Sequence, residues 1–184
     1  MTLDVIEQSV AVSGLDTLVA AHGIAGAGDI ATIPESSIQR IMRINFESVV
    51  ILWERLVPYL EASRGTFVVV SSQAGLTSEA ANGVYSASKS ALAGWARGMD
   101  GRKPVRMRVV YPGATNTPLL ESALRGMALS QQISYAELVS RRNASTPAGR
   151  LGEPREIAAA IRWLSELETP GLVEIAVTGA EVLH

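Results

Sequence analysis

The chain has 184 residues, of which 47% are hydrophobic and 18% charged, which is typical of one folded domain with its own core. The net charge of −2 gives no electrostatic reason to expect nucleic acid or an anionic membrane as a partner. The absence of cysteine and the presence of only two histidines exclude disulfides and argue against a metal site. No apolar run reaches the roughly 18 residues of a membrane span and no secretory signal opens the chain, so we expect a cytoplasmic protein.

The predicted elements alternate short apolar, β-rich runs with longer helical patterns. We expect strands at 16–21, 66–70, 105–111 and 173–177, and helices at about 36–62, 83–99 and 156–166. Continuous apolar strands separated by helices are typical of a parallel sheet that is covered on both faces. The sequence therefore predicts an α/β protein in which residues 1–184 form a single domain.

A glycine-rich turn at Gly23, Gly26 and Gly28 follows the first predicted strand. Its spacing differs from the G-x-G-x-x-G pattern of dinucleotide-binding turns, and Pro34 intervenes before the next helix. We do not interpret this turn as a phosphate-binding loop.

Tyr85 and Lys89 are four residues apart within a predicted helix, which places both side chains on one face, about one turn apart. A phenol has a pKa near 10 and is a poor base at neutral pH, but a nearby ammonium favours the phenolate. The pair can then exchange a proton with a substrate oxygen. The alternative is a surface lysine that happens to lie beside a partly buried tyrosine.

Ser72 follows the strand at 66–70 and precedes Tyr85 by thirteen residues. Ligands of parallel α/β sheets bind at the carboxyl ends of the strands, where a serine hydroxyl can contact the same substrate oxygen as the tyrosine. Ser71 is the alternative, because side chains alternate along a strand and only one of the two should face the site.

These segments resemble those of the short-chain dehydrogenase/reductase family in its single-domain form. Residues 69–75 (VVSSQAG) resemble the family's serine strand and residues 85–89 (YSASK) resemble its active-site helix; the resemblance covers nearly the whole chain. It implies a Rossmann-like, doubly wound parallel sheet and an NAD or NADP cofactor, without deciding between the two. The implied reaction interconverts a secondary alcohol and a ketone, with Ser72 orienting the oxygen and Tyr85 moving the proton. Tyr85 and Lys89 are also expected to contact the cofactor, Lys89 at the ribose.

The resemblance adds further site residues. Asn45 matches the family's fourth catalytic position and would hold a proton-relay water, although alone it would be interpreted as a helix packing residue. Pro112, Gly113, Thr115 and Thr117 match the segment that holds the nicotinamide, although Pro-Gly also favours a plain strand-ending turn.

Residues 119–146 correspond to the family's variable substrate-binding loop and lid. The substrate pocket is expected to be moderately apolar, and no particular substrate follows from it. Its expected lining residues are Ala81, Asn82, Leu119, Leu120 and Met127.

The chain departs from the family near its N-terminus, where the usual glycine-rich cofactor segment is not found. Leu3-Asp4-Val5 resembles the end of the family's third strand, whose Asp-Val pair lies near the adenine, so Asp4 and Val5 are expected to bind cofactor. Gly23 matches the glycine of the family's Asn-Asn-Ala-Gly turn and is also expected against the cofactor, but Ala20 and Ala21 replace the two asparagines. His22 could supply a hydrogen bond in their place.

We therefore expect a truncated family member whose first strand, at residues 16–21, is left as an unpaired edge that favours association. The implied assembly is a homodimer or homotetramer. The apolar residues Val49, Trp53, Leu92 and Trp95 could serve either subunit contacts or the protein's own core.

Two functions compete. The first is the oxidoreductase just described, and the alternative is a remnant without cofactor that acts as a binding or oligomerisation partner. A serine hydrolase is disfavoured, because the sequence has neither a nucleophile elbow nor a suitably placed histidine.

Overall fold

The computed structural model describes residues 3–25, 33–77 and 82–181. It contains four parallel strands in the order β1-β2-β3-β4: β1 (Thr17–Ala20), β2 (Thr66–Val70), β3 (Arg106–Pro112) and β4 (Val173–Val177). Every predicted strand is observed. Within the described residues β1 pairs with β2 alone, so the expected exposed edge is also present.

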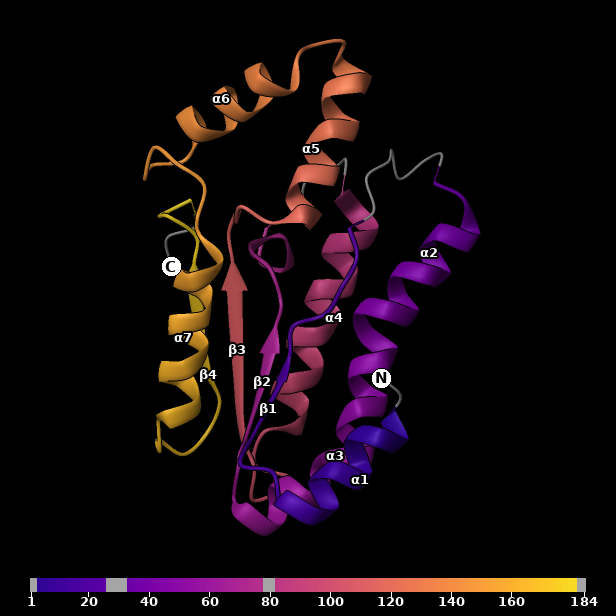
Figure 1. Cartoon of the computed structure of the whole chain (residues 1–184), viewed down its shortest axis with the longest axis vertical. Coiled ribbons are helices and arrows are strands. Elements are labelled where there is room, and N and C mark those ends of the chain that lie inside the picture. The colour runs from indigo at the N-terminus through magenta and orange to yellow at the C-terminus, as the bar shows by residue number, and fades with distance from the viewer. Residues whose placement is uncertain (1–2, 26–32, 78–81, 182–184) are drawn as a thin grey trace.

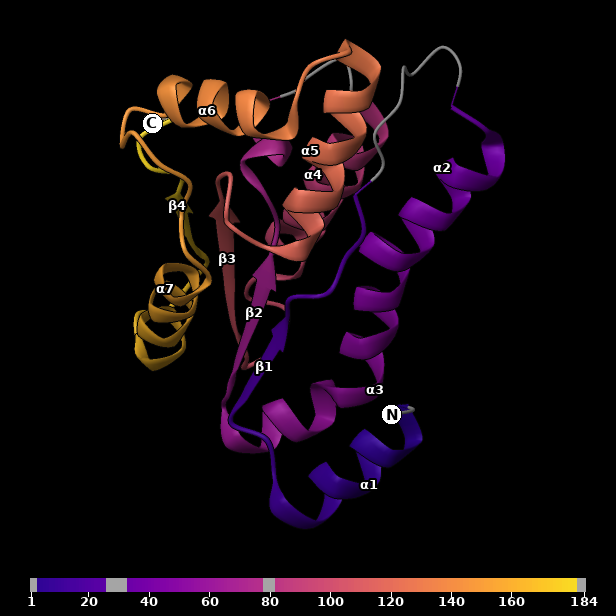
Figure 2. The ribbon, with the colours of Figure 1, turned by 45° about the horizontal axis from the view of Figure 1, so that its top comes forward.

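Helices cover both faces of this sheet, as predicted (Figure 1). α3 and α4 pack on one face, and α1 packs against α3; α7 packs on the other face against β2, β3 and β4. Beyond the carboxyl ends of the strands, α5 and α6 form a helical hairpin above the sheet (Figure 2). The helices are α1 (Leu3–Ser13), α2 (Glu35–Met42), η1 (Arg43–Glu47, a π-helical turn), α3 (Ser48–Ser63), η2 (Gln73–Gly75, a 3₁₀ turn), α4 (Gly83–Met99), α5 (Pro118–Gln131), α6 (Tyr135–Ser145) and α7 (Pro154–Glu166).

The main core lies between the sheet and the layer of α3 and α4. Phe67 and Val69 of β2 face this layer, whereas Val68 faces α7, as the alternation along a strand requires. The ring of Trp53 lies 5.4 Å from that of Phe67 and 5.8 Å, edge to face, from that of Trp95.

Four apolar residues were expected to serve either subunit contacts or the protein's own core, and the structure places them in the core. Val49, Trp53 and Leu92 are buried within the protein's own core, and Trp95 packs against them. They are therefore explained without a subunit contact.

The N-terminal expectation is wrong. Residues 3–5 do not end a strand; they form the first turn of α1. The carboxylates of Asp4 and Glu7 both pair with Arg55 of α3, and Val5 is 52% exposed. Asp4-Val5 resembled the end of a strand in sequence. The segment is instead the start of a helix that packs on α3 and pairs its carboxylates with Arg55.

Arg108 of β3 is fully buried and holds together the connection from α7 to β4. Its guanidinium donates to the carbonyls of Gly171 at 2.7 Å, Thr169 at 2.7 Å and Leu167 at 2.8 Å. Among the residues described, none of the helices is long and apolar enough to cross a membrane.

Replacing Arg108 should therefore be costly. We expect Arg108→Met to lower the free energy of unfolding by at least about 3 kcal/mol, because the fully buried guanidinium and its hydrogen bonds to several backbone carbonyls are lost. Urea denaturation measures this change. Arg102→Met is the control, since the exposed Arg102 bonds the single carbonyl of Gly98 and should change stability by less than about 0.5 kcal/mol. Similar losses in the two variants would contradict the role assigned to Arg108.

Candidate active site

A cleft of about 440 Å³ opens at the carboxyl ends of β2 and β3, beneath α5 and α6. This edge is where parallel α/β sheets bind ligands. The cleft brings together most of the predicted site residues: Gly23, Ser72, Tyr85, Lys89, Pro112, Gly113, Thr115 and Thr117.

The structure assigns separate tasks to the two adjacent serines. The hydroxyl of Ser71 is buried and donates to the carbonyl of Lys89 at 2.8 Å, which ties β2 to α4. A side chain on Gly75 would crowd this contact, since an added Cβ would lie 2.9 Å from the Ser71 Oγ. Ser72 instead caps the 3₁₀ turn, accepting from the Ala74 N–H at 3.2 Å, and it hydrogen-bonds Tyr85. Ser72 is thus the serine that faces the tyrosine.

Burial sets the ionisation of Tyr85. It raises the pKa of the phenol above its ordinary value of 10, and the hydrogen bond with Ser72 opposes this only in part. The lowering by Lys89 that the sequence suggested is not found, although the Lys89 Nζ lies 6.0 Å from the centre of the Tyr85 ring. Desolvation of the phenolate dominates, so Tyr85 is a neutral phenol at neutral pH and is suited to donate a proton.

Lys89 is 4% exposed, and burial lowers the pKa of its side chain from 10.5 to about 8. Its Nζ donates to the carbonyl of Val70 at 2.9 Å. Within the described part of the chain no carboxylate pairs with it. An ammonium has three donors, so Lys89 retains N–H groups for a ligand in the cleft.

Asn45 lies behind the cleft wall. The long predicted helix is broken at this point by the π-helical turn η1, a distortion that is frequent at functional sites. The Asn45 side chain is fully buried: its oxygen accepts from the Ile24 N–H at 2.8 Å, and its amide donates to the Ile24 carbonyl at 2.9 Å and to Ser88 at 3.0 Å. It fixes the segment after β1 beside Lys89, since a Cβ on Gly23 would lie 3.2 Å from the Asn45 oxygen and 3.3 Å from the Lys89 Nζ.

We expect Asn45→Ala to lower the free energy of unfolding by about 2–3 kcal/mol, because both backbone groups of Ile24 lose their partner. Chemical denaturation monitored by tryptophan fluorescence measures this loss. Asn116→Ala removes an amide from an exposed residue and should be nearly neutral. If Asn45→Ala were equally neutral, the hydrogen bonds of Asn45 to Ile24 would not stabilise the folded protein.

The segment after β3 is shaped by close packing. An added Cβ on Gly113 would lie 2.7 Å from the Thr178 Cα, so no other residue fits without displacing the backbone. Thr115 donates to the Gly113 carbonyl at 2.9 Å, and Thr117 caps α5 by accepting from the Leu120 N–H at 3.3 Å. Both hydroxyls thus have structural partners at the cleft wall.

The remaining predicted residues divide into four groups. Asn82, Leu119 and Leu120 line the cleft, whereas Met127 packs in the small core between α5 and α6, and Ala81 is outside the described residues. Asp4 and Val5 are not in the cleft wall. Residues 119–146, expected as a loop, are largely the two helices α5 and α6.

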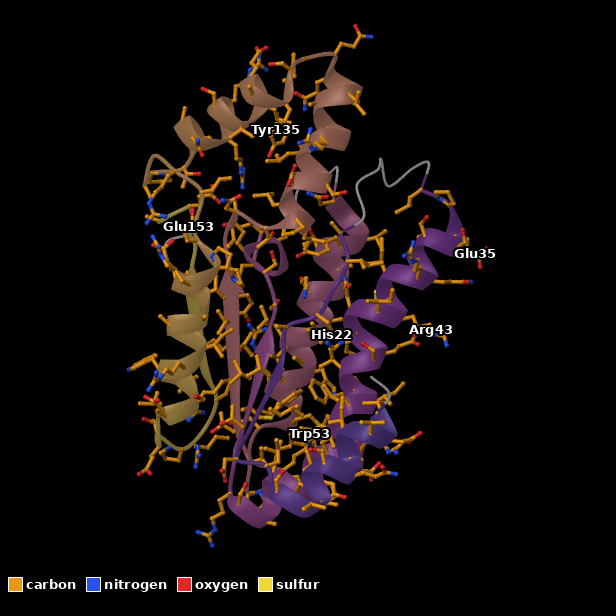
Figure 3. The ribbon with its side chains drawn as sticks, in the orientation of Figure 1. His22, Glu35, Arg43, Trp53, Tyr135 and Glu153 are labelled. Atoms are coloured by element: carbon orange, nitrogen blue, oxygen red, sulfur yellow. The ribbon has the colours of Figure 1, made fainter. Side chains whose placement is uncertain are left out.

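His22 lies where β1 ends, beside α3 (Figure 3), and its Nε2 is 2.7 Å from the Ser48 Oγ. Burial, and then the charge of Lys89, lower the pKa of His22. The histidine therefore links the end of β1 to the helix layer, a bracing contact of the kind expected in place of the missing asparagines.

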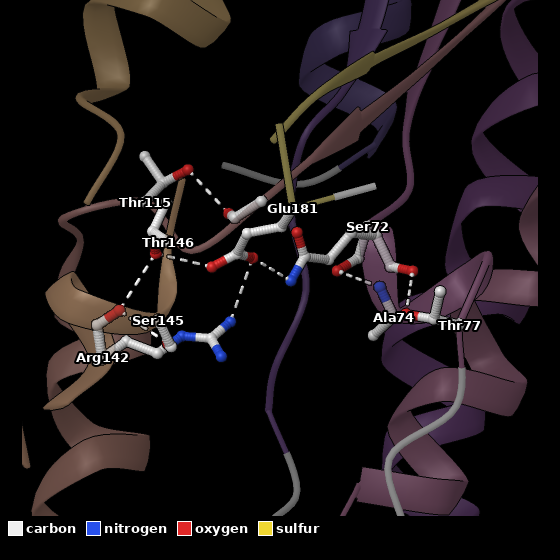
Figure 4. Close-up of polar contacts among 10 residues, drawn as sticks. Ser72, Ala74, Thr77, Thr115, Arg142, Ser145, Thr146 and Glu181 are labelled. Atoms are coloured by element: carbon white, nitrogen blue, oxygen red, sulfur yellow. Dashed lines mark hydrogen bonds and ion pairs between the residues drawn. The ribbon is translucent and has the colours of Figure 1, made fainter. Parts of the chain in front are cut away.

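Three polar residues at the cleft were not predicted from the sequence. Glu181, which follows β4, accepts a hydrogen bond from Gln73 at 2.5 Å and one from Arg142 of α6 at 3.2 Å (Figure 4). Gln73 and Arg142 line the cleft. No spacing in the sequence signals this cluster, because its members come from three distant segments.

Comparison with known proteins agrees with this geometry. The model of the family described as short chain dehydrogenase matches residues 2–128. The chain belongs to the short-chain dehydrogenase family. The resemblance inferred from the sequence motifs is therefore confirmed.

Individual members of the short-chain dehydrogenase family are moderately similar. A 3-oxoacyl-[acyl-carrier-protein] reductase of Thermotoga maritima is 30% identical, covering 90% of this chain and 65% of its own length. An inactive 2-(S)-hydroxypropyl-CoM dehydrogenase of Xanthobacter autotrophicus is 34% identical, covering 84% of this chain and 66% of its own length. The chain thus spans about two-thirds of these relatives.

The fold is shared with solved structures of the same class. Sorbitol-6-phosphate 2-dehydrogenase of Erwinia amylovora has a TM-score of 0.89 at 16% identity, covering 99% of this chain and 75% of that protein. The Rossmann-like, doubly wound arrangement predicted for this chain is confirmed.

Proposed function

We propose that this protein is an NAD- or NADP-dependent oxidoreductase that interconverts a secondary alcohol and a ketone. The observation that carries the proposal is that Ser72, Tyr85 and Lys89 meet in one cleft at the carboxyl edge of a parallel sheet. Family membership and relatives named as reductases and dehydrogenases support the reaction class.

The residues of the cleft fit the nicotinamide end of such a cofactor. Lys89 uses one donor on Val70 and keeps others for ribose hydroxyls, and the absent side chain of Gly23 leaves room beside it. Pro112, Gly113, Thr115 and Thr117 would lie along the carboxamide side. When bound, the cofactor supplies or accepts the hydride at the carbinol carbon.

Each protein group then has a distinct task in carbonyl reduction. Ser72 holds the carbonyl oxygen by a hydrogen bond, and Tyr85 donates its phenolic proton to that oxygen. The raised pKa of Tyr85 keeps this proton in place at neutral pH. The ammonium of Lys89 would hold the ribose and so place the nicotinamide beside Tyr85, and Asn45 positions the backbone beside Lys89 for proton return from solvent.

Residues 119–146, which form most of the helical hairpin of α5 and α6, would close over the cleft as a lid. It has a small core of its own around Leu124, Ala128 and Leu138, so it can move as a unit. Association through the exposed edge of β1 completes the proposal, with a homodimer or homotetramer as the expected assembly.

Reduction of a panel of ketones, monitored by the loss of NADH or NADPH absorbance, tests this function. The proposal predicts turnover that depends on both the ketone and the cofactor. Absence of turnover with every pair of a broad panel would contradict it.

The alternative is a binding partner without cofactor, which the single-sided pairing of β1 favours, since an open strand edge can accept another chain. This alternative requires that neither nucleotide binds saturably to the folded protein.

A further inference from the structure

The lid wall of the cleft carries a polar network centred on Glu181. Its carboxylate accepts from the Gln73 amide at 2.5 Å, the Thr146 hydroxyl at 2.7 Å and the Arg142 guanidinium at 3.2 Å. The Glu181 side chain is 10% exposed. Figure 4 shows Glu181 between Arg142 and Thr146 on one side and the segment of Ser72 on the other.

Arg142 is the charged member of this network that lines the cleft. Among the described residues that line the cleft, Arg142 and Lys89 are the only charged side chains. Most of the other residues that line the cleft are apolar or uncharged, including Leu119, Leu120 and Ile157. An arginine placed in such a wall is costly unless it has a partner of opposite charge.

The existing partner satisfies Arg142 only in part. A guanidinium has five N–H donors, and within the described chain the Arg142 side chain makes one hydrogen bond, to Glu181. The Arg142 side chain is 28% exposed. Donors therefore remain for a ligand in the cleft.

The Glu181 carboxylate keeps hydrogen-bond donors even if Arg142 turns to bind a ligand. Its contacts with Gln73 and Thr146 are shorter than its contact with Arg142, so both oxygens keep a donor if the guanidinium turns toward a ligand. Glu181 thus holds Arg142 at the wall before a ligand arrives. Preorganised donors of this kind favour binding because less side-chain freedom is lost.

The network also lies close to the reacting centre. Gln73 follows Ser72 directly, and its amide and the Arg142 guanidinium contact the same Glu181 oxygen. Because Ser72, Tyr85 and Arg142 all line this one cleft, a small substrate whose carbonyl oxygen contacts Ser72 and Tyr85 can extend toward Arg142.

We propose that Arg142 determines specificity by binding the carboxylate of an oxo acid or hydroxy acid whose other oxygen lies at Ser72 and Tyr85. The proposal rests on the proposed function for the position of the reacting oxygen. A guanidinium matches a carboxylate in a two-bond geometry, and an apolar wall strengthens such a pair.

The test compares acids with their neutral methyl esters, using 3-oxobutanoate, 4-oxopentanoate and 5-oxohexanoate to cover a range of lengths. The wild type should prefer one or more acids to the matched ester. Arg142→Met should lower kcat/KM for the preferred acid by about 30-fold or more, as expected for a desolvated charge pair, and change the ester by less than about 3-fold. Arg142→Lys should restore part of the preference for the acid.

Arg141→Met is the matched control. It removes the same charge from the adjacent position, where the exposed Arg141 pairs with Glu137 on the surface of α6. Its acid-to-ester ratio should remain that of the wild type, and circular dichroism should show both variants folded.

A binding measurement separates this proposal from the proposed function. The acids should raise the melting temperature of the wild type with NADH present more than the esters do, and Arg142→Met should abolish the difference. This result without turnover would remove the proposed oxidoreductase and leave the role of Arg142 intact. Equal effects of acids and esters on the wild type, or equal losses in Arg141→Met and Arg142→Met, would overturn the role of Arg142.

Discussion

Tyr85→Phe should lower the turnover of ketone reduction by about 10²- to 10⁴-fold, the usual contribution of a positioned proton donor. The variant keeps the ring but removes the group that protonates the substrate oxygen. Only the hydroxyl and its contact with Ser72 are lost, and the ring stays in place. The fold and the binding of NADH should therefore be nearly unchanged. Steady-state kinetics and a cofactor titration measure the two effects separately.

Tyr59→Phe is the control for this change. Tyr59 lies on α3, is partly buried and does not line the cleft, so loss of its hydroxyl should leave turnover within a factor of two or so. If Tyr85→Phe retained more than about a tenth of the wild-type turnover, another group would have to supply the proton.

Lys89→Met should have opposite effects on activity and stability. Turnover should fall by at least about 10²-fold, because the cofactor loses the ammonium that would hold its ribose beside Tyr85. A buried charge with a pKa of about 8 instead of 10.5 destabilises the folded state by about 3.5 kcal/mol, since each unit corresponds to about 1.4 kcal/mol. Loss of the hydrogen bond to Val70 removes about 1 kcal/mol of this gain, so the free energy of unfolding at pH 7 should rise by about 2–3 kcal/mol.

The gain in stability has a defined pH dependence. Below pH 8 the lysine is charged in both the folded and the unfolded states, so the gain from methionine is complete. Between about pH 8 and 10.5 the unfolded state binds more protons than the folded state, and the stability of the wild type rises toward that of the variant.

Lys103→Met provides the comparison, because Lys103 is the only other lysine and lies exposed on the surface, where it pairs with Glu61. Its replacement should change neither turnover nor stability appreciably. Urea denaturation at pH 7 and at pH 10.5 measures the effect, and a Lys89→Met variant less stable than the wild type at pH 7 would be inconsistent with a destabilising buried ammonium.

The sequence predicted the features whose cause is local. The four strands are continuous apolar runs, and the spacing of Tyr85 and Lys89 places them on one helix face whatever surrounds that helix. The sequence limited the catalytic serine to Ser71 or Ser72. Only the structure decides between them, because it shows the Ser71 hydroxyl bonded to the Lys89 carbonyl.

The features that depend on tertiary packing were not predictable in this way. Leu3-Asp4-Val5 is helical because α1 packs against α3 and Asp4 pairs with Arg55. Burial, rather than the neighbouring lysine, sets the pKa of Tyr85. The cluster of Gln73, Arg142 and Glu181 exists only because the chain after β4 returns beneath α6.

The central claim is that this chain holds a nicotinamide cofactor against Tyr85 and Lys89. Calorimetric titration of the folded protein with NADH and with NADPH tests it most directly. We expect saturable binding of at least one nucleotide, with about one molecule per chain, and weaker binding to Lys89→Met than to Lys103→Met. No saturable binding of either nucleotide to the wild type, or identical affinities of the two lysine variants, would contradict this account of the site.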